Sequence, residues 1–125
     1  MTYMAISIGA MLGANARFLL GGWVVDRMGA EFPYGTLLIN VSGSFAIGLV
    51  YALIERHGAP DWVRPLLIIG ILGGYTTFST FSLDALALAE RGAWVAAATY
   101  VAASVAASLG AVWLGVTVGG LGGAG

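Results

Sequence analysis

The chain has 125 residues, of which 59% are hydrophobic and 9% charged, with a formal net charge of −1 and no cysteine. Five basic and six acidic side chains are too few to cover a water-facing surface, because about 25% of the residues in soluble domains are charged. The composition therefore favours a lipid-embedded protein over a soluble bundle, excludes disulfides and thiolate metal sites, and argues against a nucleic-acid partner, which needs a basic surface.

Four apolar stretches are long enough to cross a bilayer as helices, which takes about 20 residues each. They cover residues 3–25, 34–54, 63–89 and 94–118. The short connectors between them carry nearly all of the charge, and aromatic residues stand near the span ends, as they do at membrane interfaces. We therefore predict an all-α membrane protein with one four-helix transmembrane domain, followed by a flexible glycine-rich tail at residues 119–125.

The first two spans repeat small or polar residues at every fourth position. These residues are Gly9, Gly13 and Arg17 in the first span and Asn40, Ser44 and Gly48 in the second. Residues four apart share a helix face, and small residues let membrane helices approach closely. Four short spans are too few to enclose a pore, so we expect the chain to oligomerise, with a dimer as the simplest assembly.

The connector arginines do not specify an orientation in the membrane. Arg56 and Arg64 fall on one side of the four predicted spans, and Arg27 and Arg91 fall on the other. With two arginines on each side, the positive-inside rule predicts no preferred orientation. The chain is therefore a candidate for insertion in both orientations, which would permit an antiparallel dimer.

The third span predicts an interrupted helix. Its length of about 27 residues would reach roughly 40 Å as one helix, at 1.5 Å per residue, against a hydrocarbon core of about 30 Å. We predict the interruption at Gly70, Gly73 and Gly74, followed by Thr76 and Thr77, because glycine and β-branched residues weaken helices. Broken membrane helices direct carbonyls at cations and helix N-termini at anions, so free carbonyls from Gly73 to Thr76 are candidate ligands of a hard cation.

Hydroxyl groups and aromatic rings follow the predicted interruption. Thr77, Ser79, Thr80 and Ser82 offer hydroxyl donors, while Phe78 and Phe81 share a helix face and could turn their electropositive edges toward an anion. Further uncharged donors come from Asn40 in the second span and from Tyr100, Ser104 and Ser108 in the fourth. An anion path is favoured over a cation path, because the donors are neutral, Arg17 is a buried cation and no lone carboxylate lies at mid-span.

Several of these residues have a structural alternative. A serine or threonine in a membrane helix can bond its own i−4 carbonyl, and the fourth-span residues could form a tight helix interface. Phe78 and Phe81 could be ordinary packing residues. Arg17 and Asp84 lie inside spans and are functional candidates for that reason, although both are near enough to helix ends to reach the interface, and Arg17 could hold helix ends together.

Three sequence blocks resemble the small bacterial fluoride channels of the Fluc or CrcB family. They are GAMLGANARF (residues 9–18), PYGTLLINVSGSFAIG (residues 33–48) and GILGGYTTFSTFSLD (residues 70–84). The resemblance covers all four spans in order, and the run from Gly73 to Ser82 is its most specific part. It implies a passive, fluoride-selective channel in the bacterial inner membrane, which exports cytoplasmic fluoride and so lowers its toxicity.

The resemblance also implies an assembly and roles for individual residues. The assembly is an antiparallel, dual-topology homodimer with two fluoride pores, and a structural sodium ion is held on the dimer axis by backbone carbonyls that match Gly73 and Thr76. Arg17 corresponds to an arginine near the vestibule, and Asp84 stands where many relatives carry glutamate. The pore residues implied are Asn40, Thr77, Phe78, Ser79, Thr80, Phe81, Tyr100, Ser104 and Ser108.

Two other functions are compatible with four short spans. A small multidrug or guanidinium exporter would need a membrane-embedded carboxylate in its first helix, where this chain has Arg17 and no acid. A non-transporting scaffold subunit would tolerate isoleucine at Phe78 or Phe81. An enzyme is not expected, because the sequence offers neither a nucleophile–base pair nor a cluster of histidine and carboxylate metal ligands.

Overall fold

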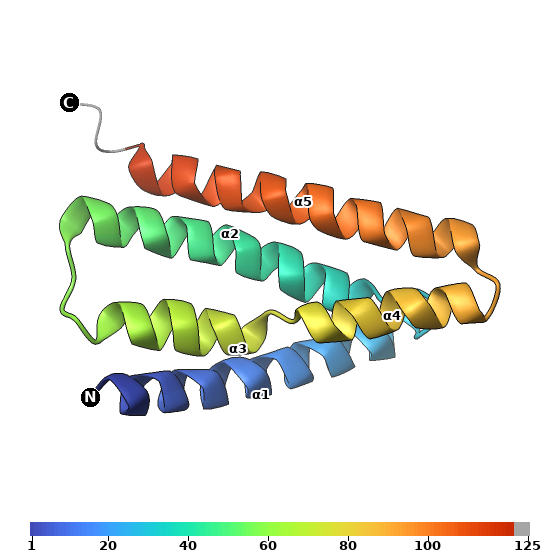
Figure 1. The fold of residues 1–125 in the computed structure, drawn as a ribbon, viewed down its shortest axis with the longest axis horizontal. Coiled ribbons are helices and arrows are strands. Elements are labelled where there is room, and N and C mark those ends of the chain that lie inside the picture. Colours follow the sequence, from blue (N-terminus) through green and yellow to red (C-terminus); the bar gives the residue numbers. More distant parts are fainter. Residues whose placement is uncertain (122–125) are drawn as a thin grey trace.

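The structure, a computed structural model, describes residues 1–121, which form helices and short connectors (Figure 1). Its elements are α1 (Thr2–Met28), α2 (Tyr34–His57), the π-helix η1 (Pro65–Leu72), α3 (Gly73–Tyr75), α4 (Phe78–Glu90) and α5 (Trp94–Gly120). Within these residues, four helical segments are long and apolar enough to span a membrane, with Pro65–Glu90 as the third. The prediction of four apolar spans is confirmed.

The helix ends differ slightly from the predicted boundaries. α2 continues to His57, and α5 continues to Gly120, so Gly119 and Gly120 are helical rather than part of the predicted tail. Gly119 is buried against α2, where an added Cβ would lie 3.0 Å from the Leu49 carbonyl oxygen. Residues 122–125 of the predicted tail lie outside the described residues.

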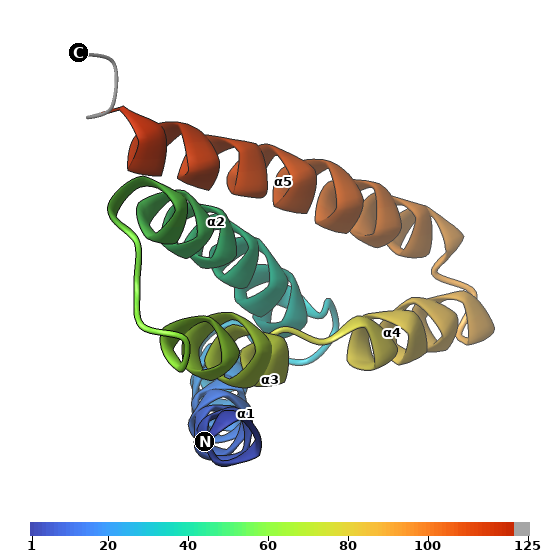
Figure 2. The ribbon, with the colours of Figure 1, turned by 60° about the vertical axis from the view of Figure 1, so that its left-hand side comes forward.

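The helices pack as two pairs. α2 packs chiefly on α5, while α1 packs on η1 and α3. α4 then diverges from α3 and packs on α5 and α2, so the two halves of the third span have different partners (Figures 1 and 2). The start of α1, the α2–η1 connector and the end of α5 lie at the same end of the molecule, as four successive crossings require (Figure 1).

The third span departs from helical geometry two residues after the predicted glycines. Thr76 (φ −78°, ψ 157°) and Thr77 (φ −151°, ψ 118°) are extended and separate α3 from α4. The extended residues are the two threonines of the predicted segment, whereas Gly70, Gly73 and Gly74, to which the interruption was attributed, are helical.

The glycines serve close helix packing instead. A Cβ added to Gly70 would lie 2.8 Å from the Cα atom of Gly9, and one added to Gly74 would lie 2.9 Å from the Ala10 carbonyl oxygen. Because both neighbours are backbone atoms of α1, the two helices approach as closely as their main chains allow, in the manner of small-residue interfaces in membranes.

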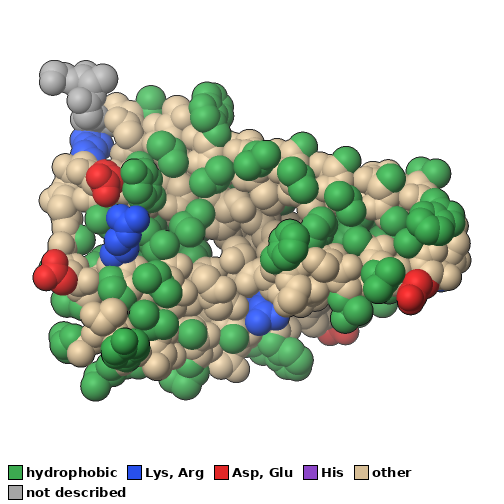
Figure 3. Space-filling view, in the orientation of Figure 1, with side chains coloured by type: hydrophobic (Ala, Val, Ile, Leu, Met, Phe, Trp, Pro, Cys, Tyr) green, Lys and Arg blue, Asp and Glu red, His purple; other side chains and the backbone are tan. Residues whose placement is uncertain are grey.

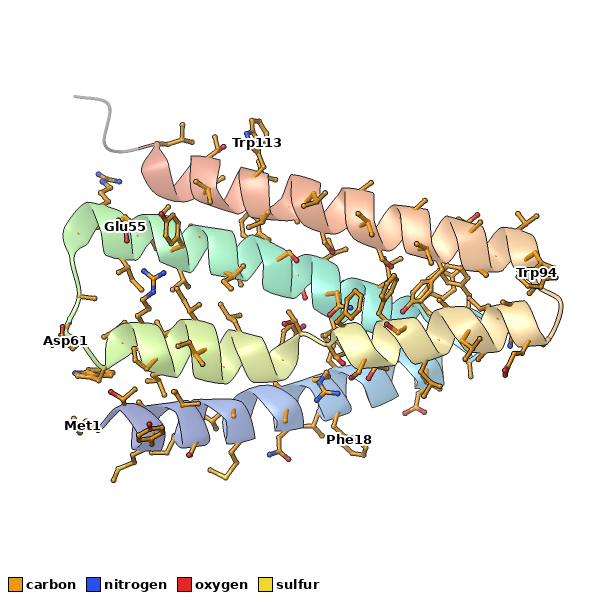
Figure 4. The ribbon with its side chains drawn as sticks, viewed as in Figure 1. Met1, Phe18, Glu55, Asp61, Trp94 and Trp113 are labelled. Carbon is orange, nitrogen blue, oxygen red and sulfur yellow. The ribbon has the colours of Figure 1, made fainter. Side chains whose placement is uncertain are left out.

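The face seen in Figure 3 carries hydrophobic side chains from one end to the other, with a few charged side chains among them. Phe18, Trp94 and Trp113 point away from the bundle (Figure 4) and are 79%, 70% and 69% exposed. Hydrophobic side chains on the outside of a helical bundle are the pattern of lipid-facing surfaces, and the interior contacts are made largely by glycine, alanine and serine.

Candidate functional site

A cavity of about 390 Å³ lies where α2, the extended residues, α4 and α5 meet, and we call it the central cavity. Seven predicted site residues line it: Asn40, Thr76, Thr77, Phe78, Phe81, Ser104 and Ser108. Three spans that are distant in the sequence thus contribute to one space. None of the described residues that line it is charged.

The Asn40 side chain is hydrogen-bonded to the main chain of Thr77 in both directions. The Thr77 amide donates to Asn40 Oδ1 at 2.8 Å, and Asn40 Nδ2 donates to the Thr77 carbonyl at 3.0 Å. These bonds occupy the amide oxygen and one of its two N–H groups. Asn40 therefore holds the extended backbone in place, and its second N–H group remains as a donor beside the cavity.

Thr77 also caps α4. Its Oγ1 accepts a hydrogen bond from the Thr80 amide at 3.2 Å and donates to Thr80 Oγ1 at 3.1 Å, which satisfies an amide at the helix start. Ser79 Oγ lies 3.4 Å from Thr77 Oγ1 and is exposed. Thr80 does not line the central cavity and faces a second one, described below.

The aromatic side chains form a continuous row from the cavity to the α4–α5 interface. The Phe81 ring lies between Phe78, with centroids 5.6 Å apart, and Tyr100, with centroids 5.3 Å apart. Tyr100 is fully buried, does not line the central cavity, and donates its hydroxyl to Asp84 Oδ2 at 3.1 Å. It therefore differs from Ser104 and Ser108, with which the sequence grouped it.

Ser104 carries a buried hydroxyl without a protein partner. Its side chain lines the central cavity, is 6% exposed, and its Oγ forms no hydrogen bond among the described residues. Serine in a membrane helix ordinarily bonds the i−4 carbonyl, and a buried polar group without any partner is destabilising. The Ser104 hydroxyl is thus free to bind something that enters the cavity.

A second cavity, of about 490 Å³, shares Thr77 with the central cavity, and we call it the outer cavity. Its lining includes Arg17, Asp84, Thr77 and Thr80, so Thr77 borders both cavities. Arg17 Nε donates to the Gly74 carbonyl at 3.2 Å, which ties α1 to α3. The two charged candidates, Arg17 and Asp84, therefore lie together in the outer cavity and away from the central one.

The main-chain carbonyls beside the extended pair have lost their usual helical partners. In a continuous helix, the Gly73 and Thr76 carbonyls would accept from the amides of Thr77 and Thr80. Those two amides donate instead to Asn40 Oδ1 and Thr77 Oγ1. Oxygen ligands of this kind suit hard cations, so these two carbonyls are the chemically fitting candidates for a cation in this segment.

Five lining residues lie outside the predicted set, namely Gly43, Ser44 and Ile47 of α2 and Val105 and Leu109 of α5. Ser44 donates its hydroxyl to the Asn40 carbonyl at 2.7 Å. The repeat of Asn40, Ser44 and Gly48 at every fourth position was a signal for this face of α2. Gly43 carried no such signal, because its importance lies in its contact with the third span.

The chain is similar throughout to known proteins. Residues 4–116 match the family described as CrcB-like protein, Camphor Resistance (CrcB). Proteins named Fluoride-specific ion channel FluC from Roseiflexus sp. (strain RS-1) and Rhizobium meliloti (strain 1021) are each 46% identical, over 94% and 92% of this chain and 96% and 93% of their own lengths. Fluoride-specific ion channel FluC 1 of Nitrobacter hamburgensis is 48% identical over 92% of both chains. The chain therefore belongs to the CrcB family of multi-pass membrane proteins.

Proposed function

We propose that this protein is a fluoride-specific channel through which cytoplasmic fluoride leaves the cell passively, which lowers its toxicity. The observation that carries the proposal is the Ser104 hydroxyl, which has no partner within residues 1–121 and is buried in an uncharged cavity between Asn40, Phe81 and the extended threonines. The names of the relatives support the same conclusion, because they are called fluoride-specific ion channels. An ion channel of this kind is not an enzyme.

The chemistry of the central cavity suits a small, strongly hydrated anion. Fluoride enters a narrow space only when donors replace its water, as in other selectivity filters. Ser104, Ser108 and the second N–H group of Asn40 supply such donors, and the edges of Phe78 and Phe81 carry partial positive charge. No charged side chain among the described lining residues would trap the ion. Conduction then needs no coupled energy source.

We propose that the working unit is an antiparallel homodimer with two pores in the bacterial plasma membrane. Phe78 lines the central cavity yet is 79% exposed in the single chain, so the cavity lies at the surface and needs a second wall. A second copy is the occupant that the balanced connector arginines allow, because they permit both orientations. Lipid covers the remaining apolar surface.

We propose further that a structural sodium ion joins the two subunits. The Gly73 and Thr76 carbonyls of each copy would hold it, since their helical amide partners bond elsewhere. When bound, a hard monovalent cation offsets the partial negative charge of the carbonyls. The contribution of this chain is to keep those carbonyls free of helical hydrogen bonds and correctly oriented.

Ion efflux from liposomes tests the proposed function. Purified protein is reconstituted with trapped potassium fluoride or potassium chloride, a potassium ionophore is added, and each anion is followed with an ion-selective electrode. We expect rapid fluoride release and chloride release at the rate of protein-free vesicles. Equal rates for the two anions would overturn fluoride selectivity, and no release of either would overturn channel function.

The topology of the dimer can be tested separately, because the chain has no native cysteine. A single Ala59→Cys substitution in the α2–η1 connector provides a unique reporter for a membrane-impermeant thiol reagent. For dual topology, we expect one fraction of the protein to be labelled from outside and the rest only after permeabilisation. Labelling from one side alone would overturn the antiparallel assembly.

A further inference from the structure

Tyr75 is the last residue of α3 and makes a side-chain contact with α2 directly before the extended pair. Its hydroxyl lies 2.8 Å from Ser42 Oγ, and this pair is partly buried. Ser42 Oγ donates its single hydrogen to the Ile39 carbonyl at 3.2 Å. Since a serine hydroxyl has one hydrogen, the Tyr75 hydroxyl is the donor to Ser42, and the three groups form one directed chain of hydrogen bonds.

The Tyr75 ring is placed by a close fit with Gly43. A Cβ added at Gly43 would lie 3.1 Å from Tyr75 Cδ2 and would also collide with the Thr76 side chain. Only a glycine at this position lets the third span approach α2 so closely. The Tyr75 ring therefore packs directly against α2, and its hydroxyl contacts Ser42 Oγ of the same helix.

Together with Asn40, this contact holds Thr76 from both sides. Tyr75 is attached to α2 through Ser42, and the Thr77 amide is attached through Asn40 Oδ1. The Thr77 amide and the Thr76 carbonyl belong to one planar peptide group, so the two attachments to α2 that flank this carbonyl help to set its direction. The Thr76 amide and hydroxyl also bond the Leu72 carbonyl within the third span.

We propose that the Tyr75–Ser42 hydrogen bond is a positioning contact that orients the Thr76 carbonyl and thereby sets the affinity of the channel for sodium. This inference rests on the proposed function, because it assumes the sodium site described there. Tyr75 and Ser42 do not line either cavity, so they act on the ion site through Thr76. Losing the bond removes the attachment to α2 on the Tyr75 side and leaves there only the bonds of the Thr76 amide and hydroxyl to the Leu72 carbonyl, so the sodium site becomes less well ordered.

The test is sodium binding measured by isothermal titration calorimetry on the full-length protein in detergent, without fluoride. We expect Tyr75→Phe and Ser42→Ala each to weaken sodium binding by about fivefold, the effect of one lost hydrogen bond. The double variant should be no weaker than either single variant, because both remove the same bond. Ser42→Thr, which retains the hydroxyl, should restore the wild-type affinity.

Tyr3→Phe is the matched control, because Tyr3 is 87% exposed at the start of α1 and far along the chain from the ion site. It should bind sodium like the wild type. Equal sodium affinity in Tyr75→Phe and the wild type would overturn the inference, as would additive losses in the double variant or an absence of measurable sodium binding in the wild type.

Fluoride efflux at saturating sodium separates this inference from the proposed function. The wild type and Tyr75→Phe should then release fluoride at similar rates, because high sodium compensates for weaker binding. Failure of the wild type to release fluoride would count against the proposed function. Normal wild-type efflux together with unchanged sodium affinity in the variants would count against the positioning contact alone.

Discussion

Asn40 and Thr77 exchange two hydrogen bonds, from the Thr77 amide to Asn40 Oδ1 and from Asn40 Nδ2 to the Thr77 carbonyl. A side-chain amide here takes the place of a neighbouring strand, because it pairs with both polar groups of one extended residue. The second span thereby satisfies main-chain groups that the third helix cannot satisfy itself, which is a strict requirement inside a membrane. Asn40 is both a wall of the cavity and the support of the extended backbone.

Asn40→Asp is expected to lower fluoride efflux by more than about tenfold. The carboxylate keeps an acceptor for the Thr77 amide but has no donor for the Thr77 carbonyl, and an unpaired buried carbonyl costs roughly 1–3 kcal/mol. The added negative charge also repels the anion. Asn15→Asp is the control, because Asn15 is exposed on α1, away from the central cavity, and bonds the Met11 carbonyl of its own helix. Liposomes that contain each variant are compared by fluoride electrode, and equal efflux from Asn40→Asp and Asn15→Asp would contradict the role of Asn40.

Ser104→Ala is expected to separate stability from conduction. Removing a buried hydroxyl that has no hydrogen-bond partner in the described part of the chain should leave the melting temperature unchanged or slightly higher. Fluoride efflux should fall, because the ion loses one of the hydrogen-bond donors that replace its hydration water. Ser82→Ala is the control, since the Ser82 hydroxyl is exposed and already bonds the Phe78 carbonyl. A Ser104→Ala variant that conducts like wild type would show that this hydroxyl is not a ligand of the ion.

The four spans could be predicted from the sequence because each span must be long enough and apolar enough to cross the bilayer, while charged residues collect in the connectors outside it. The predicted interruption included Thr76 and Thr77, but the sequence could not show that the glycines before them stay helical, because glycine has two uses in a membrane helix. Gly70 and Gly74 allow α1 to approach, and they remain helical. What separates α3 from α4 is the pairing of Thr77 with Asn40, a contact between residues 37 positions apart.

Some of the site residues could likewise be placed from the sequence, and others could not. Ser104 and Ser108 could be placed on one helical face from their spacing, and both line the central cavity. Tyr100 has the same spacing, yet its hydroxyl reaches Asp84 on α4 because α4 diverges toward α5 at this end. Spacing within one helix identifies a face, whereas the neighbour of each residue on that face depends on how the helices cross.

Phe78→Ile is expected to abolish most fluoride efflux while the protein still folds. Phe78 is 79% exposed in the single chain, so its ring contributes little to the packing of that chain, but it lines the central cavity beside Phe81. Isoleucine is apolar and of moderate size, yet it has no electropositive ring edge to present to an anion. The measurement is efflux from liposomes at matched protein content.

Phe18→Ile provides a comparison of equal exposure for the central cavity, because Phe18 is also 79% exposed and points outward from α1, and it borders the outer cavity but not the central one. It should conduct like the wild type. A scaffold function would instead predict that both variants behave alike, and full fluoride efflux from Phe78→Ile would remove the ring from the proposed path.

Gly70→Ala is expected to destabilise the protein by about 1–3 kcal/mol, the usual cost of overpacking. The new methyl group would lie 2.8 Å from Gly9 Cα and 2.9 Å from the Ile6 carbonyl oxygen, and neither backbone atom can move without shifting α1. Gly110→Ala should have the opposite sign, because nothing lies within 4 Å of its added Cβ and alanine favours a helix by about 1 kcal/mol over glycine. Thermal unfolding of both variants in detergent measures the difference. Equal shifts of the two melting temperatures would contradict the conclusion that Gly70 is required for the close packing of η1 against α1.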